Sequence, residues 1–313
     1  MNPEKVKKVA VVGAGVMGQS IAIVFANAEI DVTLVDVNEK VLHHAIKLIE
    51  SGLNTLASFG KVSRDNILYI LSRIKSSPDL TKIGEDVDFV IEAVPEDPSI
   101  KKKVFSQLDE LCDADTVLAS NTSGLDIFNI VEVKHPERLL ITHWFSPAHI
   151  IPLVEVVPGA KTSLEVVAFM VRLLGRLGKR PIVLKKFVPF FIVNRIQNAI
   201  NQAVFEILEN GWATPEDIDM AMKNTLGIRL PIVGVAQALD FTGLDLILDI
   251  MKHLGLESSF IKEKVKQGCL GAKTSKGIYN YGSRSQDEIL KRRDGLYLKM
   301  LDHLEKIKAF EPV

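Results

Sequence analysis

The chain has 313 residues, of which 47% are hydrophobic and 25% are charged, and its formal net charge is -1. This length suggests two domains, and a charge balance so close to neutral argues against nucleic-acid binding, which needs a concentrated basic surface. No run of about 18 apolar residues is free of polar interruption, so no membrane partner or membrane span is expected.

The N-terminus reads MNPEKVKKVAVVGAG and lacks the apolar region and cleavage site of a secretion signal. Cys112 and Cys269 have no metal-ligand spacing and are too few for a disulfide scaffold, so both are expected to be reduced thiols. We therefore expect a cytoplasmic protein without a metal.

The first predicted element is a buried strand over Val9–Val12, a short continuous apolar run. Glycines in G-x-G-x-x-G spacing then open a predicted helix, and a second strand, DVTLVD, ends at Asp36. Gly13 permits a tight turn, Gly15 lets the backbone approach a pyrophosphate, and Gly18 allows close packing of the helix on the strand. Because the motif stands between a strand and a helix, it predicts dinucleotide binding.

The same segment indicates which dinucleotide binds. The start of the helix, at Val16 and Met17, is expected to present unpaired N–H groups to the phosphates. Asp36 can accept hydrogen bonds from ribose hydroxyls and repels the extra phosphate of NADP, and no arginine follows it. NAD is therefore the expected cofactor.

From Val41 to Ile74 the pattern predicts helix, and DVDFVIEAVPED is the next buried strand. A helix follows from Pro98, with three lysines in its early turns. Such a cluster is usually a solvated face. Lys101 is kept as a candidate because it follows the loop at the ligand-binding edge of the sheet.

The strand TVLASNTSG ends in a polar turn, which places Asn121 and Ser123 at the same edge as the glycine loop. A serine after a strand more often caps a helix than takes part in catalysis, and its position alone leaves both roles open. Strands alternate with helices throughout this half, which predicts an α/β fold with a doubly wound, mostly parallel sheet of the Rossmann type.

The stretch ITHWFSPAHIIPLVEVVPG, from Ile141 to Gly159, carries two histidines and a glutamate in apolar surroundings. We expect one strand with His143 at one end and Glu155 at the other. The residues alone do not decide between His143 and His149 as a catalytic base.

After GKRPIVLKK the pattern changes to long helices. One continuous helix is expected up to Gly211, and the next begins with Thr214 as N-cap and Pro215 at its first position. Residues 1–186 are therefore predicted to form the NAD-binding domain, and residues 187–313 a smaller all-helical domain for substrate binding and dimerisation.

Eight segments, in order, resemble the L-3-hydroxyacyl-CoA dehydrogenase family, which includes 3-hydroxybutyryl-CoA dehydrogenases. They are VVGAGVMG, ASNTS, HWFSP, LVEVV, FIVNR, PEDID, LDFTGLD and GAKTSKGIYNY, and they span nearly the whole chain. The resemblance implies a homodimer and reversible NAD-dependent oxidation of 3-hydroxyacyl-CoA to 3-ketoacyl-CoA.

The resemblance also implies the site residues. His143 is the expected general acid/base, Glu155 orients it, and Ser123 and Asn194 donate hydrogen bonds to the substrate oxygen. His149 has no counterpart in the motif and is expected to be structural or to line the substrate site. The residues expected to bind the cofactor are Gly13, Gly15, Val16, Met17, Gly18, Asp36, Glu96, Lys101, Asn121, Ser123 and Lys273.

The chain departs from the family pattern at several positions. The family's N-T-S-S reads NTSG, ending at Gly124, and its P-G-F reads PFF, with Phe190 in place of the glycine. That phenylalanine is expected to fill space near the substrate cleft. Two positions that touch CoA in the family hold Gly52 and Phe59, although Lys61 could replace the lost charge.

Three functions remain open at this point. The leading hypothesis is a dehydrogenase of short-chain 3-hydroxyacyl-CoA. The segment IIPLVEVVPG and the extra C-terminal helix also resemble the lambda-crystallin and L-gulonate dehydrogenase branch, so a dehydrogenase of a small hydroxy acid without CoA is the alternative. A non-catalytic NAD-binding structural protein is the third, and the intact set of Ser123, His143, Glu155 and Asn194 argues against it.

Overall fold

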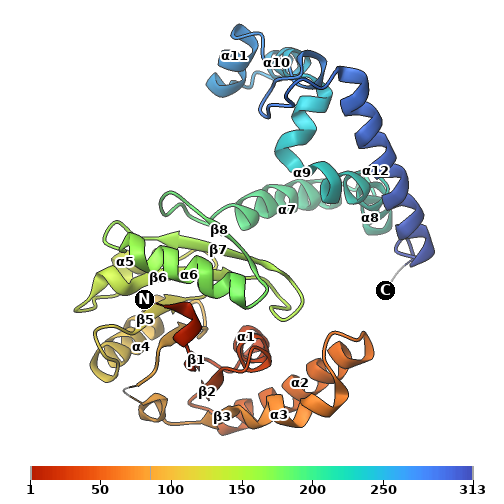
Figure 1. The fold of residues 1–313 in the computed structure, drawn as a ribbon. Helices are drawn as coiled ribbons and strands as arrows, with labels where there is room; N and C mark the ends of the chain where they lie inside the picture. The colour runs from red at the N-terminus through yellow and green to blue at the C-terminus, as the bar shows by residue number, and fades with distance from the viewer. Residues whose placement is uncertain (1, 85, 312–313) are drawn as a thin grey trace. The chain divides into compact units, whose positions relative to one another are not determined.

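The computed structural model describes residues 2–84 and 86–311. The chain divides into two compact units, Met1–Ala199 and Ile200–Val313 (Figure 1). The first is an α/β unit and the second is helical, as the sequence predicts. The expected boundary of the cofactor domain, between residues 186 and 187, stays a prediction.

The first unit is built on an eight-stranded sheet in the order β3-β2-β1-β4-β5-β6-β7-β8. Its strands are β1 (Lys8–Val12), β2 (Asp31–Val35), β3 (Ile74–Ser77), β4 (Phe89–Glu92), β5 (Val117–Ser120), β6 (Leu139–Trp144), β7 (Leu153–Pro158) and β8 (Arg180–Val183). Strands β6 and β7 are antiparallel, whereas the other neighbouring strands run parallel. The order outward from β1 in both directions is that of a doubly wound dinucleotide-binding sheet, which confirms the predicted fold class.

Helices cover both faces of this sheet. They are α1 (Val16–Asn27), α2 (Glu39–Ser58), α3 (Ile67–Ser72), α4 (Pro98–Leu111), α5 (Ile127–Ile130) and α6 (Leu164–Arg176). Successive strand residues point to opposite faces. Val9 and Val11 of β1 therefore join a core with α1, α2 and α6, whereas Ala10 and Val12 join a second core with α4 and α5.

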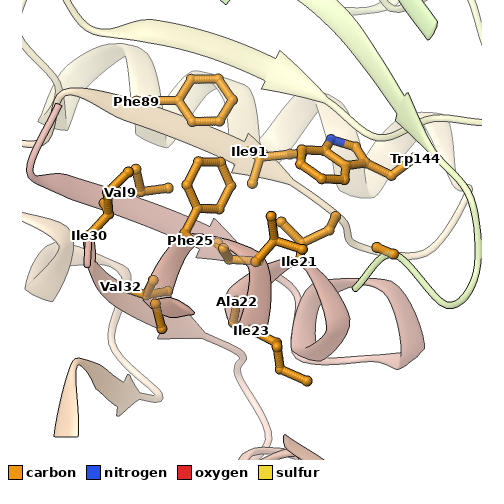
Figure 2. Packing of buried hydrophobic residues seen from close by; sticks show 14 of the residues in the cluster. Val9, Ile21, Ala22, Ile23, Phe25, Ile30, Val32, Phe89, Ile91 and Trp144 are labelled. Atoms are coloured by element: carbon orange, nitrogen blue, oxygen red, sulfur yellow. The ribbon is translucent and has the colours of Figure 1, made fainter. Parts of the chain in front are cut away.

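Phe25 fixes helix α1 on the sheet. Its ring centroid lies 5.8 Å from that of Phe89 and 6.1 Å from that of Trp144. Figure 2 shows these rings together with Ile21, Ile91 and other apolar side chains in one cluster. Aromatic side chains bury large areas and pack with defined geometry. This packing holds the N-terminus of α1 at the carboxyl end of β1, where the glycine loop lies.

The prediction of helix from Val41 to Ile74 is wrong in part. Helix α2 ends at Ser58, Gly60 follows with a φ of 66°, and Ile74 begins strand β3. Only glycine adopts that backbone conformation without cost, so the helix ends there. Strand β3 lies at the edge of the sheet and buries Ile74 alone, so no apolar run reveals it in the sequence.

The expectation of a single strand from Ile141 to Gly159 is also wrong, because the segment forms two antiparallel strands, β6 and β7. Pro147 and Pro152 stand in the connection, where their missing N–H groups would interrupt a strand's hydrogen bonds. Within one strand, residues 12 apart would be separated by roughly 40 Å. In the antiparallel pair, His143 and Glu155 are direct cross-strand neighbours.

The helical unit continues α7 (Val193–Glu209), which begins in the first unit, and contains α8 (Pro215–Lys223), α9 (Leu226–Thr242), α10 (Leu244–His253), α11 (Ser259–Lys266) and α12 (Gln286–Lys306). Thr214 caps α8 as predicted and forms a capping box with Asp217. Within residues 2–84 and 86–311, no single helix is long and apolar enough to cross a membrane. Helices α9 and α10 meet such a criterion only as a pair bent by 79°.

Candidate active site

His143 and Glu155 form a buried hydrogen-bonded pair. The imidazole Nδ1 lies 2.7 Å from Glu155 Oε2, and both side chains are almost fully buried. The antiparallel register places them side by side because cross-strand neighbours project from the same face of a sheet. When Nδ1 donates to the carboxylate, Nε2 keeps a lone pair and can accept a proton.

The carboxylate is itself held in place. Its second oxygen, Oε1, accepts hydrogen bonds from the backbone N–H groups of Ile192 (2.9 Å) and Val193 (3.1 Å). A buried charge needs such partners, and three donors leave Glu155 a single orientation. The backbone at the start of α7 therefore fixes the glutamate, and the glutamate orients the imidazole.

The other side of the imidazole faces polar groups and rings. Asn194 Nδ2 lies 3.5 Å from His143 Nε2 and 3.5 Å from the carbonyl oxygen of Ser123. The rings of Phe145 and Phe191 have centroids 4.5 and 5.2 Å from that of His143. The structure thus brings together the four residues expected to be catalytic, with Nε2 on the side of the ring away from Glu155.

Ser123 does not act as the helix cap that its position also allowed. The side chain of Thr122 accepts the N–H groups of Gly124 and Leu125, and the N-cap position of the following helix is Asp126. Ser123 itself is exposed. Its hydroxyl is therefore not needed for the local fold.

The glycine loop shows why two of its glycines are required. Gly13 has a φ of 105°, and a Cβ there would lie 2.4 Å from the carbonyl oxygen of Ala93. A Cβ on Gly18 would lie 1.7 Å from the carbonyl oxygen of Gly13. Any larger residue at these positions would push the helix away from the sheet.

Gly15 differs, because a Cβ there would meet no atom within 4 Å. It is the N-cap residue of α1, and among the described residues no side chain caps this helix end. The first turn, from Val16 through Met17, contains no acidic residue. Its free N–H groups and the open space beside Gly15 fit the pyrophosphate of a dinucleotide.

Asp36 stands at the carboxyl end of β2, where the adenosine ribose of NAD would lie. Its carboxylate accepts the N–H of Ala14 and that of Asn38, both at 3.0 Å. The side chain therefore braces the glycine loop in addition to offering acceptors to ribose hydroxyls. The residues present fit NAD.

Glu96 organises the turn that carries Ser123. Its Oε1 accepts the Thr122 hydroxyl and the N–H of Ser123 (2.8 Å), and its Oε2 lies 3.2 Å from Lys101 Nζ. Partial burial raises the pKa of Glu96, but the Thr122 hydrogen bond and the Lys101 charge outweigh it, so the net shift is downward. Glu96 is therefore a carboxylate at neutral pH.

Lys101 is not a solvated surface lysine, since its side chain is only 1% exposed. Its Nζ also lies 2.8 Å from Glu92 Oε1, and Ser120 Oγ donates to the other Glu92 oxygen at 2.6 Å. Burial raises the pKa of Glu92, and the lysine charge opposes that shift. Lys101 thus joins the carboxylates of Glu92 and Glu96, and its expected contact with the cofactor stays a prediction.

The sequence reasoning missed Glu92. The available signal was a carboxylate that ends the fully buried strand FVIE, because such a charge must have a partner. Asn121, which was expected at this edge, accepts the backbone N–H of Trp144 at 2.9 Å and so joins the ends of β5 and β6.

His149 lies in different surroundings from His143. Its Nδ1 is 2.7 Å from Ser20 Oγ on α1. Desolvation, assisted by the charge of Lys179, lowers the pKa of His149. Lys179 Nζ donates to the carbonyl oxygens of Ala148 and Ile151, which fixes the β6–β7 connection. His149 is therefore part of the packing of that connection.

Lys273 belongs to the helical unit, where its Nζ is paired with Asp245. Its expected role at the cofactor stays a prediction, as do the individual contacts of the other residues with NAD and substrate.

Comparison with known proteins bears on this site. Residues 8–187 match the model of the 3-hydroxyacyl-CoA dehydrogenase NAD-binding domain, and residues 191–281 match that of the 3-hydroxyacyl-CoA dehydrogenase C-terminal domain. The chain is 36% identical to a probable 3-hydroxybutyryl-CoA dehydrogenase of Bacillus subtilis, over 90% of this chain and 99% of the relative.

Two further relatives are named for different substrates. A 3-hydroxyacyl-CoA dehydrogenase structure from Archaeoglobus fulgidus has a TM-score of 0.79 and 33% identity, covering 96% of this chain and 99% of that one. The 5-formyl-3-hydroxy-2-methylpyridine 4-carboxylate 5-dehydrogenase of Mesorhizobium japonicum is 30% identical, over 88% of this chain and 91% of the relative.

These matches span both units and include the segments that form the glycine loop and the His143–Glu155 pair. The chain belongs to the 3-hydroxyacyl-CoA dehydrogenase family and is an NAD-dependent oxidoreductase of that family.

Proposed function

We propose that this protein oxidises short-chain L-3-hydroxyacyl-CoA, such as 3-hydroxybutyryl-CoA, to 3-ketoacyl-CoA, and that the reaction is reversible. The observation that carries the proposal is the buried His143–Glu155 pair, with the Asn194 amide 3.5 Å from the other ring nitrogen of His143. A neutral imidazole can take a proton from an alcohol, and the imidazolium that forms can return it to a ketone.

The proposed roles follow from the geometry. His143 Nε2 takes the proton of the substrate hydroxyl while the C–H bond of the carbon that carries this hydroxyl breaks. Glu155 holds the imidazole in the tautomer with Nδ1–H and stabilises the imidazolium that forms. Bound NAD supplies the acceptor for the hydride.

The substrate oxygen needs donors as its charge changes. The Asn194 amide, 3.5 Å from His143 Nε2, and the exposed Ser123 hydroxyl are the groups we assign to this role. Glu96 and Lys101 act as positioning residues, because they hold the turn that carries Ser123.

A second candidate function is the dehydrogenation of a small hydroxy acid without CoA. It is favoured by Gly52 and Phe59, which replace CoA-contacting residues of the family; the Phe59 side chain is 77% exposed. The substrate for which the Mesorhizobium relative is named is likewise not a CoA thioester.

One assay separates these functions. NADH consumption is followed with acetoacetyl-CoA, and NADH formation with 3-hydroxybutyryl-CoA and with L-gulonate. Turnover of both thioesters is expected. Turnover of the free acid alone would establish the second candidate, and no turnover with any of them would favour a non-catalytic NAD-binding protein.

We also infer a homodimer in the cytoplasm. Helix α7 buries none of its residues, and helix α8 buries none either. Phe205 and Trp212 are exposed large apolar side chains in this unit. A second copy of the chain would cover such surfaces.

A further inference from the structure

Two consecutive phenylalanines precede α7 in a backbone conformation that bulky residues rarely adopt. Phe190 has a φ of 63° and Phe191 a φ of 53°. The resulting turn directs the N–H groups of Ile192 and Val193 to Glu155. It also sends the two rings in different directions, since Phe191 is buried beside His143 while Phe190 stays 49% exposed.

The exposed ring of Phe190 packs directly on Gly124. A Cβ on Gly124 would lie 2.8 Å from Phe190 Cδ1 and 3.0 Å from Cε1. Gly124 does not have a left-handed φ, so its backbone alone does not require glycine. The ring therefore accounts for the absence of a side chain at this position.

This contact lies beside the groups that carry the chemistry. Gly124 directly follows Ser123, and the Ser123 carbonyl oxygen lies 3.5 Å from Asn194 Nδ2. Asn194 is four residues after Phe190 and 3.5 Å from His143 Nε2. The contact between Phe190 and Gly124 is therefore connected, over one to four residues of chain, to Ser123 and Asn194, the two residues assigned to the substrate oxygen.

We propose that Phe190, packed on Gly124, is a specificity-determining residue that limits the space for the acyl chain next to the reacting carbon. This inference rests on the proposed function. Longer chains normally gain binding through apolar contact, so a preference for short chains requires an obstacle. The Phe190 ring is a suitable obstacle, because its turn is fixed through Glu155 and the ring lies against Gly124.

The test compares reduction of acetoacetyl-CoA, 3-ketohexanoyl-CoA and 3-ketodecanoyl-CoA by NADH. Phe190→Ala removes the ring and keeps the strain of a side chain at a φ of 63°, whereas Phe190→Gly removes the ring and relieves that strain. In both variants we expect the ratio of kcat/KM for 3-ketodecanoyl-CoA to that for acetoacetyl-CoA to rise by about tenfold or more. Phe260→Ala, which removes a 53% exposed ring from α11, is the control and should leave this ratio unchanged.

The contact with Gly124 is tested separately. Gly124→Ala should displace the ring, because the added methyl group would lie too close to it, and should change kcat/KM most for the longest chain. In the Phe190→Ala background the same change should have little effect, because there is no ring to displace. Circular dichroism and NADH binding of each variant report whether the nucleotide-binding unit is intact.

The outcomes are distinct. A wild type that reduces acetoacetyl-CoA while Phe190→Ala leaves the chain-length ratio unchanged overturns this inference alone, and so does an equal rise for all three thioesters. A Gly124→Ala effect that persists without the ring overturns the proposed contact. A wild type inactive with every thioester overturns the proposed function and this inference with it.

Discussion

His143 owes its orientation to a single carboxylate, and that carboxylate is held by two backbone N–H groups. Glu155→Gln keeps the size of the side chain but removes the charge that stabilises an imidazolium. We expect His143→Ala and Glu155→Gln each to lower kcat by about 10²–10⁴-fold. NADH binding should change little in either variant, which fluorescence titration of NADH can check.

His149→Ala is the matched control for the His143→Ala and Glu155→Gln variants, because the His149 side chain forms a hydrogen bond with Ser20 and not with the catalytic groups. It should retain most of the turnover. A loss equal to that of His143→Ala would identify His149 as the base and contradict the assignment.

The lowered pKa of His149 has a consequence for stability. Above its ordinary pKa of 6.5 the imidazole is neutral in both the folded and the unfolded chain, so it has no effect. As the pH falls through 6.5, the unfolded chain takes up the proton first, and the free energy of unfolding decreases. His149→Gln should therefore reduce the loss of stability between about pH 8 and about pH 5.5, measured by urea unfolding. An identical loss in both proteins would contradict this.

The sequence could point to residues within the family segments that occur in order along the chain. It could not predict contacts that depend on how the strands pair. His143 and Glu155 were identified through HWFSP and LVEVV, yet their contact arises only because β6 and β7 are antiparallel. Glu92 belongs to no recognised motif. Its role is seen only in the structure, where it accepts a hydrogen bond from Lys101. The contact of Phe190 with Gly124 joins positions far apart in the chain and needed three-dimensional coordinates.

At the scale of elements, the start of α1 both packs closely on the sheet and leaves space for the pyrophosphate of NAD. Substitutions at Gly18 and Gly15 should affect these two properties separately. Gly18→Ala would place a methyl group against the carbonyl oxygen of Gly13, so the helix must move. We expect the free energy of unfolding to fall by about 1–3 kcal/mol, as for other overpacked sites. Urea unfolding measures this change.

Gly15→Ala is the matched variant, since its methyl group would meet no protein atom within 4 Å. Its free energy of unfolding should stay close to that of the wild type, while NADH binding weakens because the methyl group occupies the space for the pyrophosphate. Strong NADH binding by Gly15→Ala would show that the dinucleotide lies elsewhere.

Elements were predictable where they are buried or capped. Strand β1 appears as a continuous apolar run, and α8 begins at a complete capping box. Strand β3 was missed because an edge strand with one buried residue leaves no periodic signal. The β6–β7 connection was not predicted, because the apolar residues on both sides of it suit one long strand. Pro147 and Pro152 are the signal that a strand is interrupted there.

At the scale of the whole molecule, the two units differ in how much core they contain. The sheet unit has large clusters on both faces, whereas the buried cluster of the helical unit consists of Ala272, Tyr281 and Ile289. The change from alternating strands to long helices predicted the two classes of unit. It could not predict how little of the helical unit is buried within one chain, because helical periodicity does not reveal whether an apolar face meets its own chain or a second copy.

The small core of the helical unit leads to the last prediction. Phe205 and Leu208 lie three residues apart on α7 and are both exposed, and Trp212 is exposed just beyond the end of that helix. If a second copy covers this face, the wild type should sediment as a dimer, and its Tm should rise with protein concentration. Phe205→Asp would place a charge in that interface and should yield a monomer with a lower Tm. Leu68→Asp, at a 77% exposed position on α3, is the control and should remain dimeric. A wild type that is monomeric at every concentration, with a Tm independent of concentration, would refute the dimer.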